Sequence, residues 1–142
     1  MNLINSLEEI ENETDLVCYI SGRANKFTNM LKELLFSGYK VDEDVWFCGT
    51  QYNLLLPSTC WRRPYDHYRV DMMFRSSNYA IPIELKIYAN DSALSQIKRY
   101  MSAISTNVLG LIVTMKATKK LKEMIKEEDD IVLLVLEEGK LY

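Results

Sequence analysis

The amino-acid sequence predicts an α/β fold with one mixed central β-sheet and helices on both of its faces. Two observations lead to this prediction. Segments with strand-like patterns fill the middle of the chain, and segments with helical spacing stand before and after them. In the second half, helix, strand, helix and strand follow one another, as in a β-α-β unit with parallel strands and a right-handed crossover. With 142 residues, 48% of them hydrophobic, we expect a single domain over residues 1–142.

The first part of the chain is predicted to be helical. Apolar residues between positions 3 and 10 fit a short amphipathic helix with acidic residues on its other face. Residues 16–20 either extend this helix or form a short buried segment, and both interpretations stay open. Residues 23–36 show a stronger helical pattern, and Gly38 lies where that helix would stop.

Strands are expected next. Residues 41–48 and 52–56 are aromatic and aliphatic, and with Gly49 between them they predict a strand pair. Residues 57–65 hold two prolines and several small polar residues, which predicts a loop.

A β-hairpin follows in the prediction. Its strands lie at 68–75 and 80–88, and Ser76, Ser77 and Asn78 supply turn chemistry between them. The alternation of apolar and polar residues along both strands predicts one buried face and one charged face.

The last third is predicted to alternate between helices and buried strands. Cap residues at 90–92 begin a helix that runs to about residue 104. Residues 108–115 and 131–136 are almost entirely apolar, as expected for strands that are covered on both faces. Between them, residues 118–128 form a lysine-rich helix.

The cysteine and histidine content limits the kinds of site. Cys18, Cys48 and Cys60 are odd in number and lack CxxC spacing, which argues against a disulfide framework or a structural zinc site. We therefore expect reduced thiols and a cytoplasmic location. His67 is the single histidine, so any metal would be held by oxygen atoms, which favours a hard cation such as Mg²⁺.

No export or membrane segment is expected. Residues 1–15 lack a basic region and an apolar signal core. The longest apolar runs, at 108–113 and 131–136, are far too short to cross a bilayer.

Charge is distributed unevenly along the chain. The formal net charge is −3, which does not fit a protein that coats nucleic acid without specificity. Acidic residues gather at 8–15, and basic residues gather at 62–75 and 116–126. Local basic patches on an acidic protein suit an enzyme that engages a polyanion briefly.

The predicted hairpin brings two carboxylates together. With a turn at Ser77 and Asn78, the numbers of paired residues sum to 155, so Asp71 lies opposite Glu84. Two carboxylates about 5 Å apart repel each other unless a positive charge lies between them, and a divalent cation provides that charge. Lys86 lies on the same face of the second strand, where its ammonium could approach a phosphate or the attacking water.

These groups match the needs of phosphodiester hydrolysis, which are a Lewis acid, an activated water and a cation for the developing charge. On the helix that follows, Gln96 and Tyr100 stand at positions i and i+4 and share one helix face. Gln96 could bind substrate or a water, and Tyr100 could contact DNA or support the lysine. An equally weighted interpretation is a tyrosine that packs on the core beside a solvated glutamine.

These motifs resemble those of the PD-(D/E)xK nuclease superfamily. Asp71, twelve intervening residues and Glu84-Leu85-Lys86 match its D…ExK pattern, and residues 96–100 are similar to the QxxxY motif of its RecB-type branch. The resemblance covers roughly residues 23–115. It implies a restriction-endonuclease-like core in which Asp71, Glu84 and the backbone carbonyl of Leu85 bind Mg²⁺ or Mn²⁺. It also implies that Lys86 is the catalytic lysine.

Some residues depart from the family pattern. Val70 stands before Asp71, where the family motif names a proline. Many members add an acidic ligand from the first core helix, for which Glu33 is the candidate and three others compete: Glu8, Glu9 and Glu11. Pro82 removes a ladder donor and favours a sheet edge or a bulge, whereas the family places this strand inside the sheet.

The sequence therefore predicts a small Mg²⁺-dependent nuclease that acts on DNA; an endonuclease is favoured, and both exonucleolytic cutting and RNA as the substrate stay open. Arg62, Arg63 and Arg69 are candidate phosphate contacts beside the centre. We expect no separate recognition domain in so short a chain, so sequence specificity would need a homodimer or another partner. The alternative is a catalytically inactive module on the same fold that binds nucleic acid or a protein.

Overall fold

A computed structural model describes residues 6–36, 44–54 and 69–142 of the chain. The helices of this part are η1 (Leu7–Glu9), α1 (Glu13–Ser21), α2 (Ala24–Phe36), α3 (Asp91–Ser102) and α4 (Lys119–Ile125). Its strands are β1 (Trp46–Asn53), β2 (Arg69–Arg75), β3 (Tyr79–Ala89), β4 (Asn107–Val108), β5 (Gly110–Ala117), β6 (Ile131–Val135) and β7 (Lys140–Leu141). None of the described helices is both long enough and apolar enough to cross a membrane.

The strands form one mixed sheet. Its order is β1-β2-β3-β5-β6-β7, and β4 pairs with β3 beside this path. Neighbouring strands are antiparallel from β1 to β3, parallel from β3 to β6, and antiparallel again between β6 and β7. The parallel strands are joined through α3 and α4, because a parallel pair needs a long crossover connection. The predicted α/β class with a mixed central sheet is confirmed, and the short strand β7 was not predicted.

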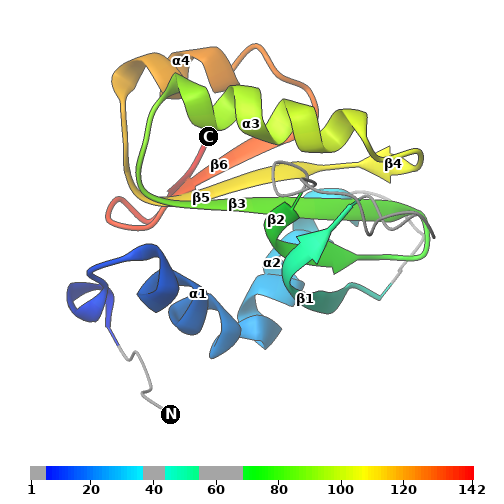
Figure 1. The fold of residues 1–142 in the computed structure, drawn as a ribbon, viewed down its shortest axis with the longest axis horizontal. Helices are drawn as coiled ribbons and strands as arrows, with labels where there is room; N and C mark the ends of the chain where they lie inside the picture. Colours follow the sequence, from blue (N-terminus) through cyan, green and yellow to red (C-terminus); the bar gives the residue numbers. More distant parts are fainter. Residues whose placement is uncertain (1–5, 37–43, 55–68) are drawn as a thin grey trace, which may run out of the picture.

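Helices cover both faces of the sheet, as predicted (Figure 1). On one face, α1 and α2 bury side chains such as Leu16 and Ile20 against Ile83 and its neighbours on the strands. On the other face, α3 and α4 pack with Ile97 and other side chains around Ile112. All five side chains named here are fully buried. The sheet therefore separates two hydrophobic cores. Residues 16–20, whose structure the sequence left open, lie inside α1.

The predicted strand pair around Gly49 is wrong. The chain forms one strand there, β1, which does not reverse and pairs along its length with β2. The register shifts between Phe47 and Gly49, and Gly49 has a φ of 147°, which glycine tolerates because it has no side chain. The glycine marks a bulge and not a turn. Residues 41–43 and 55–56 of the predicted pair, and the predicted loop at 57–65, lie outside the described residues.

Pro82 lies inside the sheet, and the hairpin has no bulge there. Pro82 pairs with Met73 of β2 in an unshifted register. On the other side of β3, the Leu109 N–H donates to the Ala80 carbonyl at 3.0 Å, and a regular parallel ladder would return a bond from residue 82 to Leu109. Proline has no N–H to donate, and the neighbouring strand is interrupted at this point. The missing bond accounts for the split of the predicted strand 108–115 into β4 and β5.

Candidate metal centre

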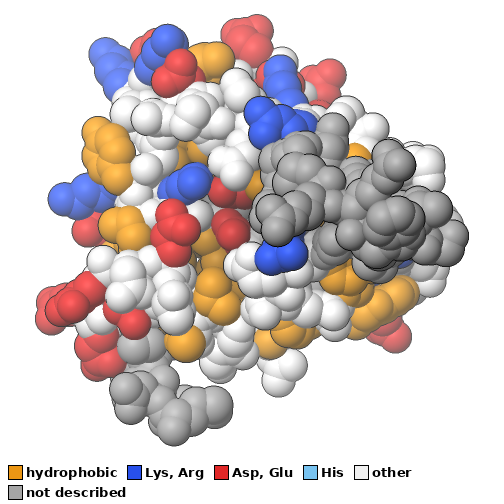
Figure 2. Space-filling view, in the orientation of Figure 1, with side chains coloured by type: hydrophobic (Ala, Val, Ile, Leu, Met, Phe, Trp, Pro, Cys, Tyr) orange, Lys and Arg blue, Asp and Glu red, His pale blue; other side chains and the backbone are white. Residues whose placement is uncertain are grey.

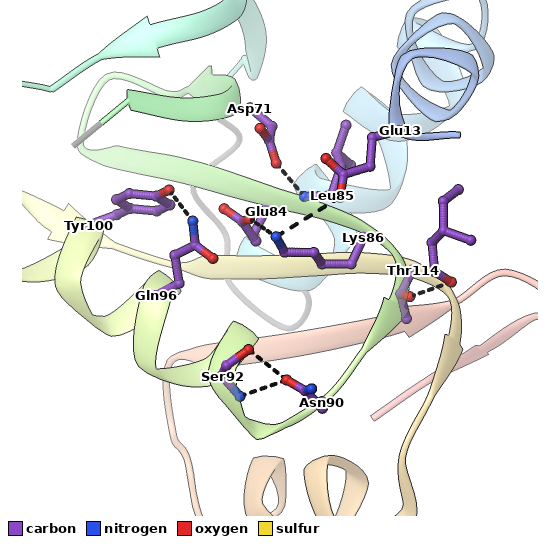
Figure 3. A network of polar contacts seen from close by, with 11 residues as sticks. Glu13, Asp71, Glu84, Leu85, Lys86, Asn90, Ser92, Gln96, Tyr100 and Thr114 are labelled. Carbon is purple, nitrogen blue, oxygen red and sulfur yellow. Dashed lines mark hydrogen bonds and ion pairs between the residues drawn. The ribbon is translucent and has the colours of Figure 1, made fainter. Parts of the chain in front are cut away.

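The hairpin of β2 and β3 has the predicted register. Met72 pairs with Ile83, and the other pairs of the hairpin also sum to 155. Asp71 and Glu84 follow directly after this last pair. There the two strands part, and the Asp71 Oδ2 accepts a hydrogen bond from the Leu85 N–H at 2.8 Å (Figure 3). A carboxylate therefore takes the place that a backbone carbonyl would hold in a continued ladder.

Beyond the hairpin, one edge of β3 is open in the part of the chain that the structure describes. The ladder with β2 ends at Ile83, whereas β3 runs on to Ala89 with β5 on its other side. The N–H and C=O of a strand residue project to the same edge, so the Leu85 carbonyl lies on the Asp71 side. Helices α1 and α3 flank this edge from opposite faces of the sheet (Figure 1). Figure 2 shows acidic and basic side chains together in the middle of this view.

Glu84 is a buried acid with an unsatisfied oxygen. The residue is 2% exposed, and its Oε1 lies 3.5 Å from the Lys86 Nζ. The Oε2 is buried and has no hydrogen-bond partner among the described residues. Burial and the Asp71 carboxylate raise the pKa of Glu84 to about 7, against the opposing effect of the Lys86 ammonium. An orphaned buried acceptor is uncommon in proteins and indicates a place for a ligand or a cation.

Asp71 shares this electrostatic environment. Its pKa is raised, chiefly by burial, while the hydrogen bond from the Leu85 N–H opposes the increase. Glu13 raises the pKa further, and Lys86 and Gln51 lower it. Two adjacent acids that hold their protons more tightly than usual would release them to a divalent cation, because the cation removes their mutual repulsion.

Lys86 and Glu13 complete the charged cluster. The Lys86 Nζ lies 3.9 Å from the Glu13 Oε1, in addition to its contact with Glu84. Glu13 stands in the first turn of α1, which begins there because the Asn12 side chain caps the helix. The Lys86 side chain is 30% exposed, so its ammonium stays accessible to a solute while it touches both acids. Lys86 thus bridges an acid of the sheet and an acid of the helix (Figure 3).

Gln96 and Tyr100 reach the cluster from α3. The Gln96 Nε2 donates a hydrogen bond to the Tyr100 hydroxyl at 2.8 Å. Tyr100 is buried, and burial together with Glu84 raises its pKa to about 12, so the hydroxyl stays protonated. Its oxygen accepts from Gln96, and the hydroxyl has the effect of lowering the pKa of Glu84. The burial of Tyr100 favours support of Glu84 over contact with DNA.

The helical acid that the structure brings to the cluster is Glu13, through its contact with Lys86, whereas Glu33 lies elsewhere. Glu33 is exposed on α2, where it lines a shallow pocket with Met30, Leu34 and Leu141 instead of approaching the Asp71 and Glu84 carboxylates. The competing candidates are exposed in or beside η1: Glu8, Glu9 and Glu11. Sequence reasoning missed Glu13. The signal that could have found it is Asn12, a helix-capping residue directly before an acidic first turn.

The predicted phosphate contacts are only partly described by the structure. Arg69 is exposed at the beginning of β2, two residues before Asp71. Arg62 and Arg63, and the single histidine, His67, lie outside the described residues.

Comparison of the chain with protein-family models, curated proteins and solved structures finds no match. What the centre does is therefore inferred from its own residues. The described part of the chain contains no group of three or more His, Cys, Asp or Glu side chains that could hold a metal ion. The oxygen atoms that fit a cation beside the orphaned Glu84 Oε2 are those of the Asp71 and Glu84 carboxylates and the Leu85 carbonyl. This set fits a hard cation such as Mg²⁺, which commonly takes one or two carboxylates and completes its shell with water and substrate phosphate.

Proposed function

We propose that this chain is a divalent-metal-dependent nuclease that hydrolyses phosphodiester bonds of DNA, with a restriction-endonuclease-like core of the PD-(D/E)xK type. One observation carries the proposal. Among the residues that the structure describes, the buried Glu84 Oε2 has no hydrogen-bond partner, a second carboxylate, Asp71, lies beside this glutamate, and the Lys86 ammonium stands 3.5 Å from its Oε1. A cation at this place would satisfy the orphaned oxygen and relieve the repulsion that raises both pKa values.

Asp71, Glu84 and the Leu85 carbonyl are the groups that would hold Mg²⁺ or Mn²⁺. The bound cation would supply Lewis acidity to a phosphoryl oxygen and lower the pKa of a water. The hydrogen bond from the Leu85 N–H restrains the Asp71 Oδ2 in the absence of a metal. Glu13 is a helical acid that contacts Lys86, which makes it the candidate for the additional acid that many family members carry.

Lys86 is the residue that would act on the substrate. Its ammonium is partly exposed on the open edge of β3, where it can contact a phosphate and offset the charge that develops during attack. Tyr100 would support Glu84 through its hydroxyl, and Gln96 would hold that hydroxyl in place. Arg69 is the described arginine that could position a neighbouring phosphate.

We propose DNA as the substrate because the groups of the site would act on phosphates, and not because a surface of the protein would read bases. Phosphate contacts carry no sequence information, so the groups described here would act on DNA, and RNA would also satisfy them. A homodimer or another partner would be needed to select a site.

Cleavage assays test this proposal. Plasmid and single-stranded DNA are incubated with the parent protein in Mg²⁺, in Mn²⁺ and in EDTA, alongside Glu84→Ala and Lys86→Ala. Lys119→Ala is the matched control, because Lys119 is an exposed lysine of α4. We expect metal-dependent cutting by the parent and the control, and losses of two or more orders of magnitude in both site variants. If the parent and the site variants cut equally well, Glu84 and Lys86 do not belong to a catalytic centre.

The same assay has an outcome that favours the alternative. If the parent neither cuts any substrate nor binds Mn²⁺ in a calorimetric titration, the chain is better described as an inactive module that binds nucleic acid or a protein. Buried opposed carboxylates with raised pKa values speak for the nuclease, because a module without metal would retain their repulsion to no benefit.

A further inference from the structure

Gln51 has an unusual backbone conformation on β1. Of the residues that the structure describes, it is the one non-glycine residue with a positive φ, at 49°. A side chain in this left-handed region is strained, and such strain persists only where the surrounding structure maintains it. Gln51 is exposed, so burial of its own side chain does not explain the conformation. Strained residues of this kind concentrate at functional sites, so the neighbours of Gln51 are relevant to its role.

The strand register places Gln51 next to the metal centre. Thr50 pairs with Met72 and Tyr52 pairs with Val70, so Gln51 stands in register with Asp71. Asp71 follows the Met72–Ile83 pair of the hairpin, so a continuation of that register leads from Asp71 to Glu84 on β3. Three adjacent strands therefore contribute one residue each to a row across the sheet. Gln51 is the outermost member of this row, and β1 is the strand that the sequence did not connect with the site.

The side chain of Gln51 acts on the carboxylate of Asp71. Its side chain makes a hydrogen-bonding contribution that lowers the pKa of Asp71, a smaller one than that of the Leu85 N–H. The Leu85 N–H already holds the Asp71 Oδ2 from the β3 side. A second donor on the β1 side would fix the rotation of the carboxylate about its Cβ–Cγ bond, which one hydrogen bond alone does not do. The left-handed conformation also breaks the alternation of side chains along β1, which changes the direction of this one side chain relative to its neighbours.

We infer that Gln51 is a positioning residue of the centre, whose amide holds the Asp71 carboxylate in the orientation that a divalent cation requires. The strained backbone at residue 51 is kept for this placement. Groups that orient a metal ligand typically change metal affinity by about ten- to a hundredfold when they are removed. This inference rests on the proposed function, because it assigns Gln51 a role toward the cation that Asp71 and Glu84 would hold.

The test uses substitutions that separate the strain from the amide. Gln51→Gly removes both, because glycine adopts a positive φ freely, whereas Gln51→Ala removes the amide and retains the strain. Gln51→Asn keeps an amide on a residue that tolerates the left-handed region. Thr50→Ala is the matched control, an exposed neighbour on the same strand. Each full-length variant is titrated with Mn²⁺ by calorimetry, and its thermal unfolding is followed in EDTA.

We expect the Gly and Ala variants to bind Mn²⁺ about tenfold more weakly than the parent, and the Asn variant to lie between them and the parent. Gln51→Gly should also unfold at the same temperature as the metal-free parent or a higher one, which separates weak binding from loss of the fold. The Thr50→Ala variant should bind like the parent.

Two outcomes would overturn the inference alone. If Glu84→Ala abolishes Mn²⁺ binding but Gln51→Gly and Gln51→Ala bind within about twofold of the parent, Gln51 has no positioning role. If Thr50→Ala weakens binding as much as Gln51→Ala does, the effect belongs to β1 and not to the amide. If the parent itself binds no Mn²⁺, the proposed function and this inference fail together.

Discussion

Glu84 is the residue on which the centre depends, and its burial makes the metal-free protein sensitive to pH. Its pKa of about 7 in the folded protein lies above the ordinary value of 4.5, so the folded state holds this proton more tightly than the unfolded chain. The free energy of unfolding therefore falls as the pH rises from about 4.5 to 7 and stays low above that range. A pKa difference of this size corresponds to roughly 3 kcal/mol at most.

The uncharged variant Glu84→Gln should be more stable than the parent at high pH. In EDTA at pH 8 it should unfold several degrees above the parent, because it cannot carry the buried charge, and this advantage should disappear at pH 5. Thermal unfolding followed by circular dichroism at the two pH values measures the difference. Glu123→Gln, at an exposed position of α4, is the control and should behave alike at both. A gain of the same size at pH 5 and pH 8 would contradict the prediction.

Metal binding should release a proton from the same residue. A carboxylate must lose its proton before it can coordinate, so Mn²⁺ binding should release about one proton at about pH 6 and almost none at about pH 9. Calorimetric titrations in two buffers with different ionisation enthalpies report the number released. If the apparent enthalpy does not depend on the buffer at pH 6, Glu84 is not the ligand that we describe.

Glu13 and Glu33 provide a paired test of which acid serves the centre. Both stand on helices that cover the same face of the sheet, but Glu13 contacts Lys86 and Glu33 lines a separate pocket. We expect Glu13→Gln to lower Mn²⁺-dependent cleavage by about tenfold and Glu33→Gln to leave it within about twofold of the parent. Initial rates of DNA cleavage at saturating Mn²⁺ measure the loss in each variant. A larger loss of cleavage in Glu33→Gln than in Glu13→Gln would favour Glu33, the acid predicted from the sequence.

At the scale of elements, the centre joins an open strand edge to two helices. β3 supplies Glu84, Leu85 and Lys86, and it extends beyond its pairing with β2, so that no described strand covers this edge of these residues. The turn arithmetic predicted which residues of the hairpin meet, because a two-residue turn fixes the register of an antiparallel pair. It could not predict that the strands part at Asp71, since this depends on the side-chain hydrogen bond to the Leu85 N–H.

β1 shows where sequence patterns are insufficient. Gly49 between two apolar segments is equally compatible with a turn and with a bulge, and the choice depends on pairing with β2, which is a long-range contact. The contribution of Gln51 was hidden for the same reason. Glu13 could not be distinguished from the other acids at 8–15, because the sequence does not state which turn of α1 faces the open edge of β3.

α3 supports the site through Tyr100, and this can be tested without disturbing the core. Tyr100→Phe keeps the ring but removes the hydroxyl that accepts from Gln96 and acts on Glu84. We expect a loss of about 1 kcal/mol in the free energy of unfolding, together with weaker Mn²⁺ binding. Denaturant unfolding and calorimetry measure the two effects. Tyr88→Phe, at a position that is 61% exposed, is the control and should change neither quantity. A Tyr100→Phe variant that equals the parent in both would show that the tyrosine only fills space.

At the scale of the whole molecule, the sheet holds the centre between two independent cores. Alternation along the strands and helical spacing predicted the class, the mixed sheet and the covered faces, because each follows from burying one face of every element. The centre sits where β2 stops covering β3, with α1 on one side of the sheet and α3 on the other (Figure 1). Substrate would approach along this open edge, which requires no opening of either core.

The central claim is that Lys86 assists hydrolysis at a cation held by Asp71 and Glu84. The most direct measurement compares cleavage of single-stranded DNA and plasmid by Lys86→Ala with that by the parent in saturating Mn²⁺, with Mn²⁺ binding measured on the same samples. We predict that the parent cleaves DNA in a Mn²⁺-dependent manner. We predict that Lys86→Ala still binds Mn²⁺ but cuts at least about a hundredfold more slowly. A Lys86→Ala variant that binds the cation and cuts as fast as the parent would contradict the account.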